Sequence, residues 1–128
     1  MLCCKRQSIM LGEIMKHIMR LNSEPFEMIK SGIKTIELRL YDEKRSKIRV
    51  GDEIEFLLAT DESLRCSCTV RRLYRFSSFE ELYGALPLLK CGYTEKDIEA
   101  AHYTDMEKYY SREKQKEYGV VGIEIELL

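Results

Sequence analysis

Hydrophobic and polar residues alternate over five stretches of the chain, and each alternation predicts a β-strand. The predicted strands cover residues 15–21, 34–41, 53–58, 64–76 and 120–127. In the longest of them, Cys66, Cys68, Val70 and Arg72 lie two residues apart and so share one side. The pattern therefore predicts a sheet of about five strands, each with one face toward a core.

A short helix is predicted between the first two strands. Asn22 and Ser23 are residue types that cap helix N-termini, and Pro25 suits a first helical turn. Gly32 then supplies a residue that adopts the left-handed conformation easily after a helix. The chain should enter the second strand directly after this turn.

Further helical signals lie between the fourth and fifth strands. Ser78 and Glu81 form a capping-box pattern. Helical turns are also predicted at 86–90 and 94–101, from 104, and at 113–118, where Gly119 closes the last. Because helices do not separate the strands regularly, the pattern argues against a doubly wound parallel sheet. We expect an α+β fold, a small antiparallel or mixed barrel with helices at one side.

The segment 42–49 is dense in charged residues and has two interpretations. In the first, it is a solvated turn or a single helical turn. In the second, Lys44, Arg45, Lys47 and Arg49 form one bank of a local basic patch.

Length and charge limit the functions to be considered. The 128 residues suffice for one domain, which we place at 13–128 after an N-terminal extension at 1–12. The net charge is −1, without the basic excess typical of proteins that hold long nucleic acids. No apolar run is long enough for a membrane span, and no secretory signal is evident, so we expect a cytoplasmic protein. Any contact with nucleic acid should be local, or the ligand should be small.

The cysteines and histidines do not suggest a metal site. The five cysteines include no C-x-x-C pair, and their number is odd, which argues against a disulfide framework or a zinc site. His17 and His102 are isolated and lack metal-ligand spacing. We expect no metal and no cofactor.

Residues 32–39 contain the most informative polar pattern. Glu37 and Arg39 should project from the same side of the second strand, with Lys34 just before them. One interpretation is a structural network in which a partly buried Glu37 needs cationic partners. In the other, Lys34 and Arg39 bind a phosphate or a polarised carbonyl, while Glu37 orients them or accepts a proton from a base amino group. A glutamate between two cations should stay ionised.

Three motifs together resemble the ASCH domain, a member of the PUA-like superfamily. They are G-x-K-x-x-E-x-R at 32–39, K-I-x-V-G-D-x-I-x-F at 47–56, and Y-G-V-V-G-I at 118–123. The resemblance covers about residues 13–128. It implies a PUA-like mixed β pseudobarrel of about five to six strands, with helices packed at its side and a cleft beside the first motif.

The resemblance leaves the function open. PUA-like domains are associated with RNA, and some ASCH proteins resemble hydrolases acting on acylated cytidine nucleosides or on RNA. In the amidohydrolase branch a threonine stands where this chain has Glu37, which weakens that interpretation because a carboxylate cannot replace the nucleophile. The ribonuclease branch uses a tyrosine, a lysine and a serine, for which Tyr41, Lys47 and Ser111 are the candidate counterparts.

Tyrosines near the end of the chain supply a further hypothesis. Tyr109 or Tyr110 could border the cleft and stack on a base. The sequence thus predicts that RNA, a nucleotide or a nucleoside binds to Gly32, Lys34, Glu37, Arg39 and Tyr110, without DNA specificity. Hydrolysis is the alternative, with Lys34, Glu37, Tyr41, Lys47 and Ser111 as candidate catalytic residues. The oligomeric state is not predicted.

Overall fold

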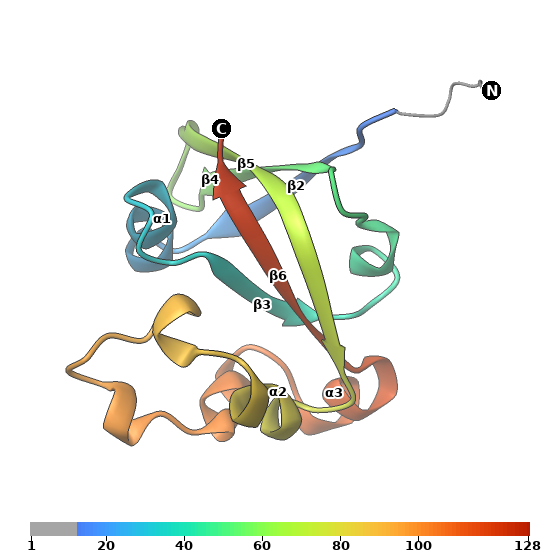
Figure 1. Ribbon diagram of the computed structural model, residues 1–128, viewed down its shortest axis with the longest axis vertical. Coiled ribbons are helices and arrows are strands. Elements are labelled where there is room, and N and C mark those ends of the chain that lie inside the picture. Colours follow the sequence, from blue (N-terminus) through green and yellow to red (C-terminus); the bar gives the residue numbers. More distant parts are fainter. Residues whose placement is uncertain (1–12) are drawn as a thin grey trace.

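A five-stranded mixed sheet forms the frame of the protein, as a computed structural model describes it for residues 13–128 (Figure 1). The strands are β2 (Lys16–Leu21), β3 (Ile36–Leu40), β4 (Glu53–Leu58), β5 (Asp61–Phe76) and β6 (Val120–Leu127). Their order is β2-β4-β5-β6-β3, in which β2 and β4 are parallel and the other neighbours antiparallel. The predicted fold class is confirmed, whereas the extension predicted at 1–12 lies outside the described residues.

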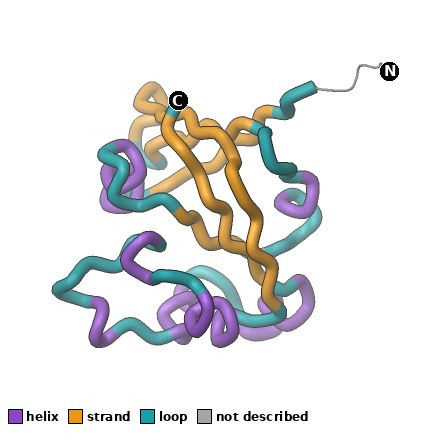
Figure 2. The backbone as a smooth tube through the Cα atoms, in the orientation of Figure 1, coloured by secondary structure: helices purple, strands orange, loops and turns teal. Residues whose placement is uncertain are grey.

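The helices are short and most of them lie on one side of the sheet. The α-helices are α1 (Ser23–Lys30), α2 (Phe79–Ala85) and α3 (Arg112–Tyr118). The 3-10 turns are η1 (Arg45–Lys47), η2 (Leu88–Lys90), η3 (Ile98–Ala100) and η4 (Tyr103–Lys108). The segment from α2 to α3 lies together beside β3, away from α1 (Figures 1 and 2). No helix among residues 13–128 is long and apolar enough to cross a membrane.

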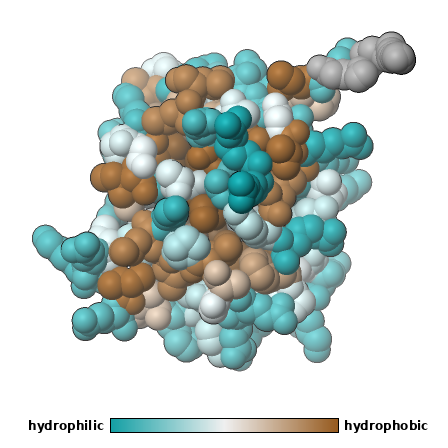
Figure 3. Space-filling model, in the orientation of Figure 1, coloured by the Kyte–Doolittle hydropathy of each residue, from teal (hydrophilic) through white to brown (hydrophobic). Residues whose placement is uncertain are grey.

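Two apolar clusters hold these layers together. The first fills the concave side of the sheet against α1 and includes Phe26, Ile29 and Phe56. The second joins β3 to the α2–α3 segment and includes Leu38 and Phe79. On the face shown in Figure 3, hydrophobic and hydrophilic residues are intermixed, as on most folded domains. The second cluster fixes the helical segment next to β3.

The turn between α1 and β3 follows the sequence prediction. Gly32 has a φ of +85°, which favours glycine. The backbone N–H groups of Ile33 and Lys34 both donate to the carbonyl of Met28, at 2.9 and 3.0 Å. These bonds satisfy the C-terminal end of α1 and place Lys34 immediately before β3.

One predicted strand face is wrong in part. Cys66, Cys68 and Val70 are buried on one side of β5, but Arg72 is exposed. The reason is a β-bulge, since Val70 pairs with Ile125 and Arg72 pairs with Glu124, the next residue of β6. The extra residue reverses the alternation, which hydrophobic patterning alone does not reveal.

The helix predicted at 94–101 is also wrong. The Asp97 carboxylate accepts a hydrogen bond from the backbone N–H of Thr94, and only η3 follows. Such local side-chain bonds compete with the helical ladder. The helix predicted from Thr104 is the 3-10 turn η4, and the charged segment 42–49 contains the single turn η1, as its first interpretation predicts.

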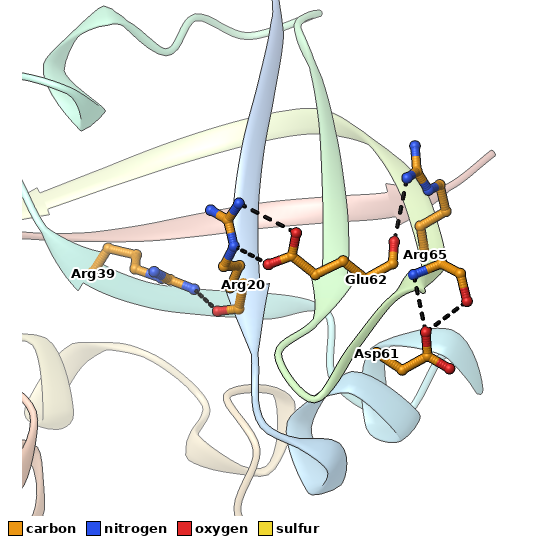
Figure 4. Close-up of polar contacts among 6 residues, drawn as sticks. Arg20, Arg39, Asp61, Glu62 and Arg65 are labelled. Atoms are coloured by element: carbon orange, nitrogen blue, oxygen red, sulfur yellow. Dashed lines mark hydrogen bonds and ion pairs between the residues drawn. The ribbon is translucent and has the colours of Figure 1, made fainter.

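The sheet curls into a half-barrel, so that its two edge strands approach each other. Arg39 on β3 donates from Nη2 to the main-chain carbonyl of Arg20 on β2, at 3.1 Å (Figure 4). The Arg20 guanidinium in turn pairs with Glu62 on β5. The Arg39 side chain therefore spans the seam between β2 and β3.

Candidate functional site

Lys34, Glu37 and Arg39 converge at one end of this seam. Lys34 Nζ lies 2.8 Å from Glu37 Oε1, and Arg39 Nε lies 2.6 Å from Glu37 Oε2. Lys34 is only 9% exposed and Glu37 only 3%. The structure thus brings the three polar residues of the 32–39 motif together around one carboxylate. Gly32 supplies the turn that precedes them.

The charge state of this group follows from its contacts. Burial alone would raise the pKa of Glu37, but the charges of Lys34 and Arg39 and their hydrogen bonds outweigh it and lower the pKa to about 2. Burial would likewise lower the pKa of Arg39, yet its contact with Glu37 leaves that pKa raised. At neutral pH the group therefore contains two cations and one carboxylate.

Residues 90–92 support Lys34 from the neighbouring segment. The backbone N–H of Thr35 donates to the carbonyl of Lys90 at 2.9 Å. Gly92 has a φ of +113°, and a Cβ there would lie 3.4 Å from Lys34 Cδ and 3.6 Å from Lys34 Nζ. The lysine side chain thus rests against a glycine, whose positive φ disfavours any other residue at this position. Burial raises the pKa of the adjacent Cys91 thiol to about 11, so this thiol stays protonated.

The three residues open into a cleft of about 380 Å³ between the β2–β3 seam and the helical segment. Its walls carry both signs of charge in equal number. The cationic lining residues are Arg20, Lys34, Arg39 and Lys108, and the anionic ones are Glu24, Glu37, Asp97 and Asp105. The cleft is therefore polar but has no net charge from its side chains.

Tyrosines form much of the opposite wall. Tyr93 donates a hydrogen bond to Asp105 Oδ2 at 2.7 Å, and its hydroxyl lies 2.7 Å from that of Tyr83. Burial and these bonds raise the pKa of Tyr93, while its hydroxyl lowers the pKa of Asp105. Tyr110 stacks on buried Phe79 with ring centroids 6.2 Å apart, whereas Tyr109 is 58% exposed. The Tyr109 ring is thus largely exposed at the cleft, with Lys108 Nζ 5.3 Å from its centroid.

Sequence reasoning found only part of this wall. Tyr109 and Tyr110 were expected near the site, and both line the cleft. The bonded set of Tyr83, Tyr93 and Asp105 was missed. Tyr83 lies in α2, but its partners Tyr93 and Asp105 lie in a loop and in η4, where no periodicity indicates which side chains meet.

The three candidate counterparts of the ribonuclease residues lie elsewhere. Tyr41 packs under the guanidinium of Arg75, which lies 3.9 Å from the ring centroid. Lys47 borders a separate shallow hollow with His17, and Ser111 caps α3 by accepting from the backbone N–H of Lys114. None of the three lines the cleft at Lys34. Within residues 13–128, no cluster of His, Cys, Asp and Glu could hold a metal ion.

Comparisons with known proteins agree with the fold. Residues 19–128 match the family model of the ASCH domain. The crystal structure of the hypothetical protein PH0355 is 35% identical, with a TM-score of 0.73, covering 89% of this chain and 100% of that one. The solution structure of PF0455 from Pyrococcus furiosus is 38% identical, with a TM-score of 0.68, covering 89% of this chain and 98% of that one.

A more distant structure shares the fold alone. A variant of ZmASCH from Zymomonas mobilis is 12% identical, with a TM-score of 0.61, covering 87% of this chain and 67% of that one. No curated protein matches the chain.

Proposed function

This chain belongs to the ASCH domain family, and from that premise we propose that it binds RNA, a nucleotide or a nucleoside in the cleft at Lys34, Glu37 and Arg39. The observation that carries the proposal is the convergence of these three side chains on an open cleft whose other wall is rich in tyrosine. Packed structural ion pairs do not need such a cleft beside them.

The chemistry of the cleft suits a nucleobase. Lys34 offers N–H donors to a carbonyl or phosphate oxygen, and ionised Glu37 holds the lysine ammonium in place. Tyr109 presents an accessible ring on which a base can stack, a contact that tolerates any base. A hydrogen-bond donor and an aromatic surface thus lie around one cleft.

Binding fits this arrangement better than hydrolysis. With a pKa of about 2, Glu37 is a weak base and cannot serve as a general acid at neutral pH. Thr35, the hydroxyl residue immediately before β3, does not line the cleft. A binding role requires neither a nucleophile nor an acid at this position.

The proposal can be tested by titrating the protein with nucleosides, nucleotides and a short unstructured RNA, followed by amide chemical shifts. Binding should shift resonances of residues that line the cleft. Tyr109→Ala should weaken binding by about fivefold to about 150-fold, since stacking on one base contributes roughly 1–3 kcal/mol. Tyr118→Ala is the matched control, because Tyr118 is also exposed but lies outside the cleft.

Two results would contradict the proposal. One is the absence of any shift with all three ligand classes. The other is an equal loss of affinity in Tyr109→Ala and Tyr118→Ala, which would place the ligand elsewhere. Incubation with acylated cytidine and with RNA, with and without Mn²⁺, tests the alternative: product formation that Lys34→Met abolishes would establish a hydrolase.

A further inference from the structure

The charge balance of the cleft restricts the ligand that it can hold. Four cationic and four anionic side chains line it, and Lys34 and Arg39 share the single carboxylate of Glu37. Sites that bind phosphate groups usually concentrate cations, because each phosphate brings negative charge into the site. A balanced lining offers no such excess.

The positions of the negative charges also disfavour a bound phosphate. Asp97 and Asp105 lie on the helical segment across the cleft, and Glu24 lies at the start of α1. A phosphorylated ligand bound at Lys34 would bring its charge between these carboxylates. Like charges in one cleft repel each other.

The Lys34 ammonium nevertheless needs an acceptor. It is only 9% exposed, and among the described residues Glu37 is the one acceptor in contact with its three N–H groups. Two of these N–H groups therefore remain without a described protein acceptor at the head of the cleft, where a ligand oxygen can accept from them. A neutral carbonyl oxygen satisfies them without adding charge.

We infer that the ligand is an uncharged, carbonyl-bearing nucleobase or nucleoside, bound through Lys34, rather than a phosphorylated nucleotide or an RNA backbone. This inference rests on the proposed function and narrows it. The base stacks on Tyr109, its carbonyl oxygen accepts from Lys34, and its sugar lies toward the acidic wall.

The experiment compares uridine, cytidine, their 5′-monophosphates, inorganic phosphate and a short oligouridine by calorimetry or amide shifts. The nucleosides should bind at least about tenfold more tightly than the monophosphates, and phosphate alone should not bind. Raising the salt from about 50 to about 200 mM should change nucleoside affinity by less than about twofold, whereas six or more phosphate contacts would cost about 10³-fold or more.

A substitution that removes one charge from the cleft provides a second test in the folded protein. Glu24→Gln removes one negative charge from the cleft at an exposed position, so the affinity for the monophosphate should rise severalfold relative to that for the nucleoside. Glu113→Gln makes the same change on α3, outside the cleft, and should leave this ratio unchanged.

The outcomes separate the two proposals. Tighter binding of the monophosphates or of oligouridine, with a steep salt dependence, would overturn the neutral-ligand inference and leave the proposed function standing. An equal change in the ratio of monophosphate affinity to nucleoside affinity in Glu24→Gln and Glu113→Gln would also overturn the inference. No binding by any compound would refute both.

Discussion

Glu37→Gln tests the electrostatic account of the site. In the folded protein the pKa of Glu37 is about 2, against an ordinary value of 4.5. At 1.36 kcal/mol for each pH unit, this difference corresponds to about 3 kcal/mol of stability. Because the pKa is lowered by folding, this stability is present above the ordinary value and is lost as the pH falls toward 2.

The measurable part lies between about pH 6 and about pH 3. From the two pKa values, the wild type should lose roughly 2 kcal/mol of unfolding free energy over this range through Glu37 alone. Glu37→Gln has no such titration, so its unfolding free energy should fall by roughly 2 kcal/mol less than that of the wild type. The variant will be less stable at neutral pH, since it leaves Lys34 and Arg39 without their carboxylate.

The assay is urea unfolding followed by circular dichroism at both pH values. Glu113→Gln serves as the control, because its carboxylate is exposed and forms no ion pair with any described residue. The unfolding free energy of Glu113→Gln should change between the two pH values as that of the wild type does. If Glu37→Gln is too unstable to measure, titration of the wild-type Glu37 carboxyl by NMR gives the same answer. The reasoning would be refuted if the unfolding free energies of all three proteins changed equally with pH, or if the Glu37 carboxyl titrated with a midpoint near 4.5.

Three further substitutions test the fold around the site by urea unfolding. Arg39→Lys removes the bond from Nη2 to the carbonyl of Arg20 and should cost about 1–2 kcal/mol; no loss would mean that the seam does not depend on this bond. Gly119→Ala should cost about 1–3 kcal/mol, because φ is +75° and the new Cβ would lie 3.1 Å from the carbonyl oxygen of Phe76; a neutral result would contradict this backbone conformation. Ser78→Ala should cost about 1 kcal/mol through loss of the α2 cap, whereas Ser78→Thr, as control, should retain most of it.

The parts of the fold that depend on local patterning were predictable. Alternation indicated all five described strands, and Gly32 marked the turn into β3 because only a left-handed residue fits there. The bulge that exposes Arg72 was not predictable, since it depends on how β5 pairs with a strand about fifty residues away. The failed helix at 94–101 reflects a local side-chain bond of Asp97 that competes with helix formation.

The candidate site likewise has a part that was predictable from the sequence and a part that was not. Lys34, Glu37 and Arg39 could be grouped from the sequence because they lie within six residues, with Glu37 and Arg39 on one strand face and Lys34 just before the strand. Their partners could not, because Gly92, Tyr93 and Asp105 reach the cleft through loops whose course is set by packing against β3. The sequence therefore indicated the head of the cleft but not its opposite wall.

The structural and functional interpretations of the 32–39 motif apply to different residues. Arg39 uses Nε on Glu37 and Nη2 on the carbonyl of Arg20, and Glu37 uses both oxygens on its two cations. These two side chains are committed to closing the seam and to holding Lys34. Lys34 retains N–H groups without a protein acceptor among the described residues, so in the proposed function the lysine is the residue that contacts the ligand directly. A positioned lysine needs both partners to stay in place, so in the proposed function Glu37 and Arg39 serve binding by positioning Lys34 and without touching the ligand.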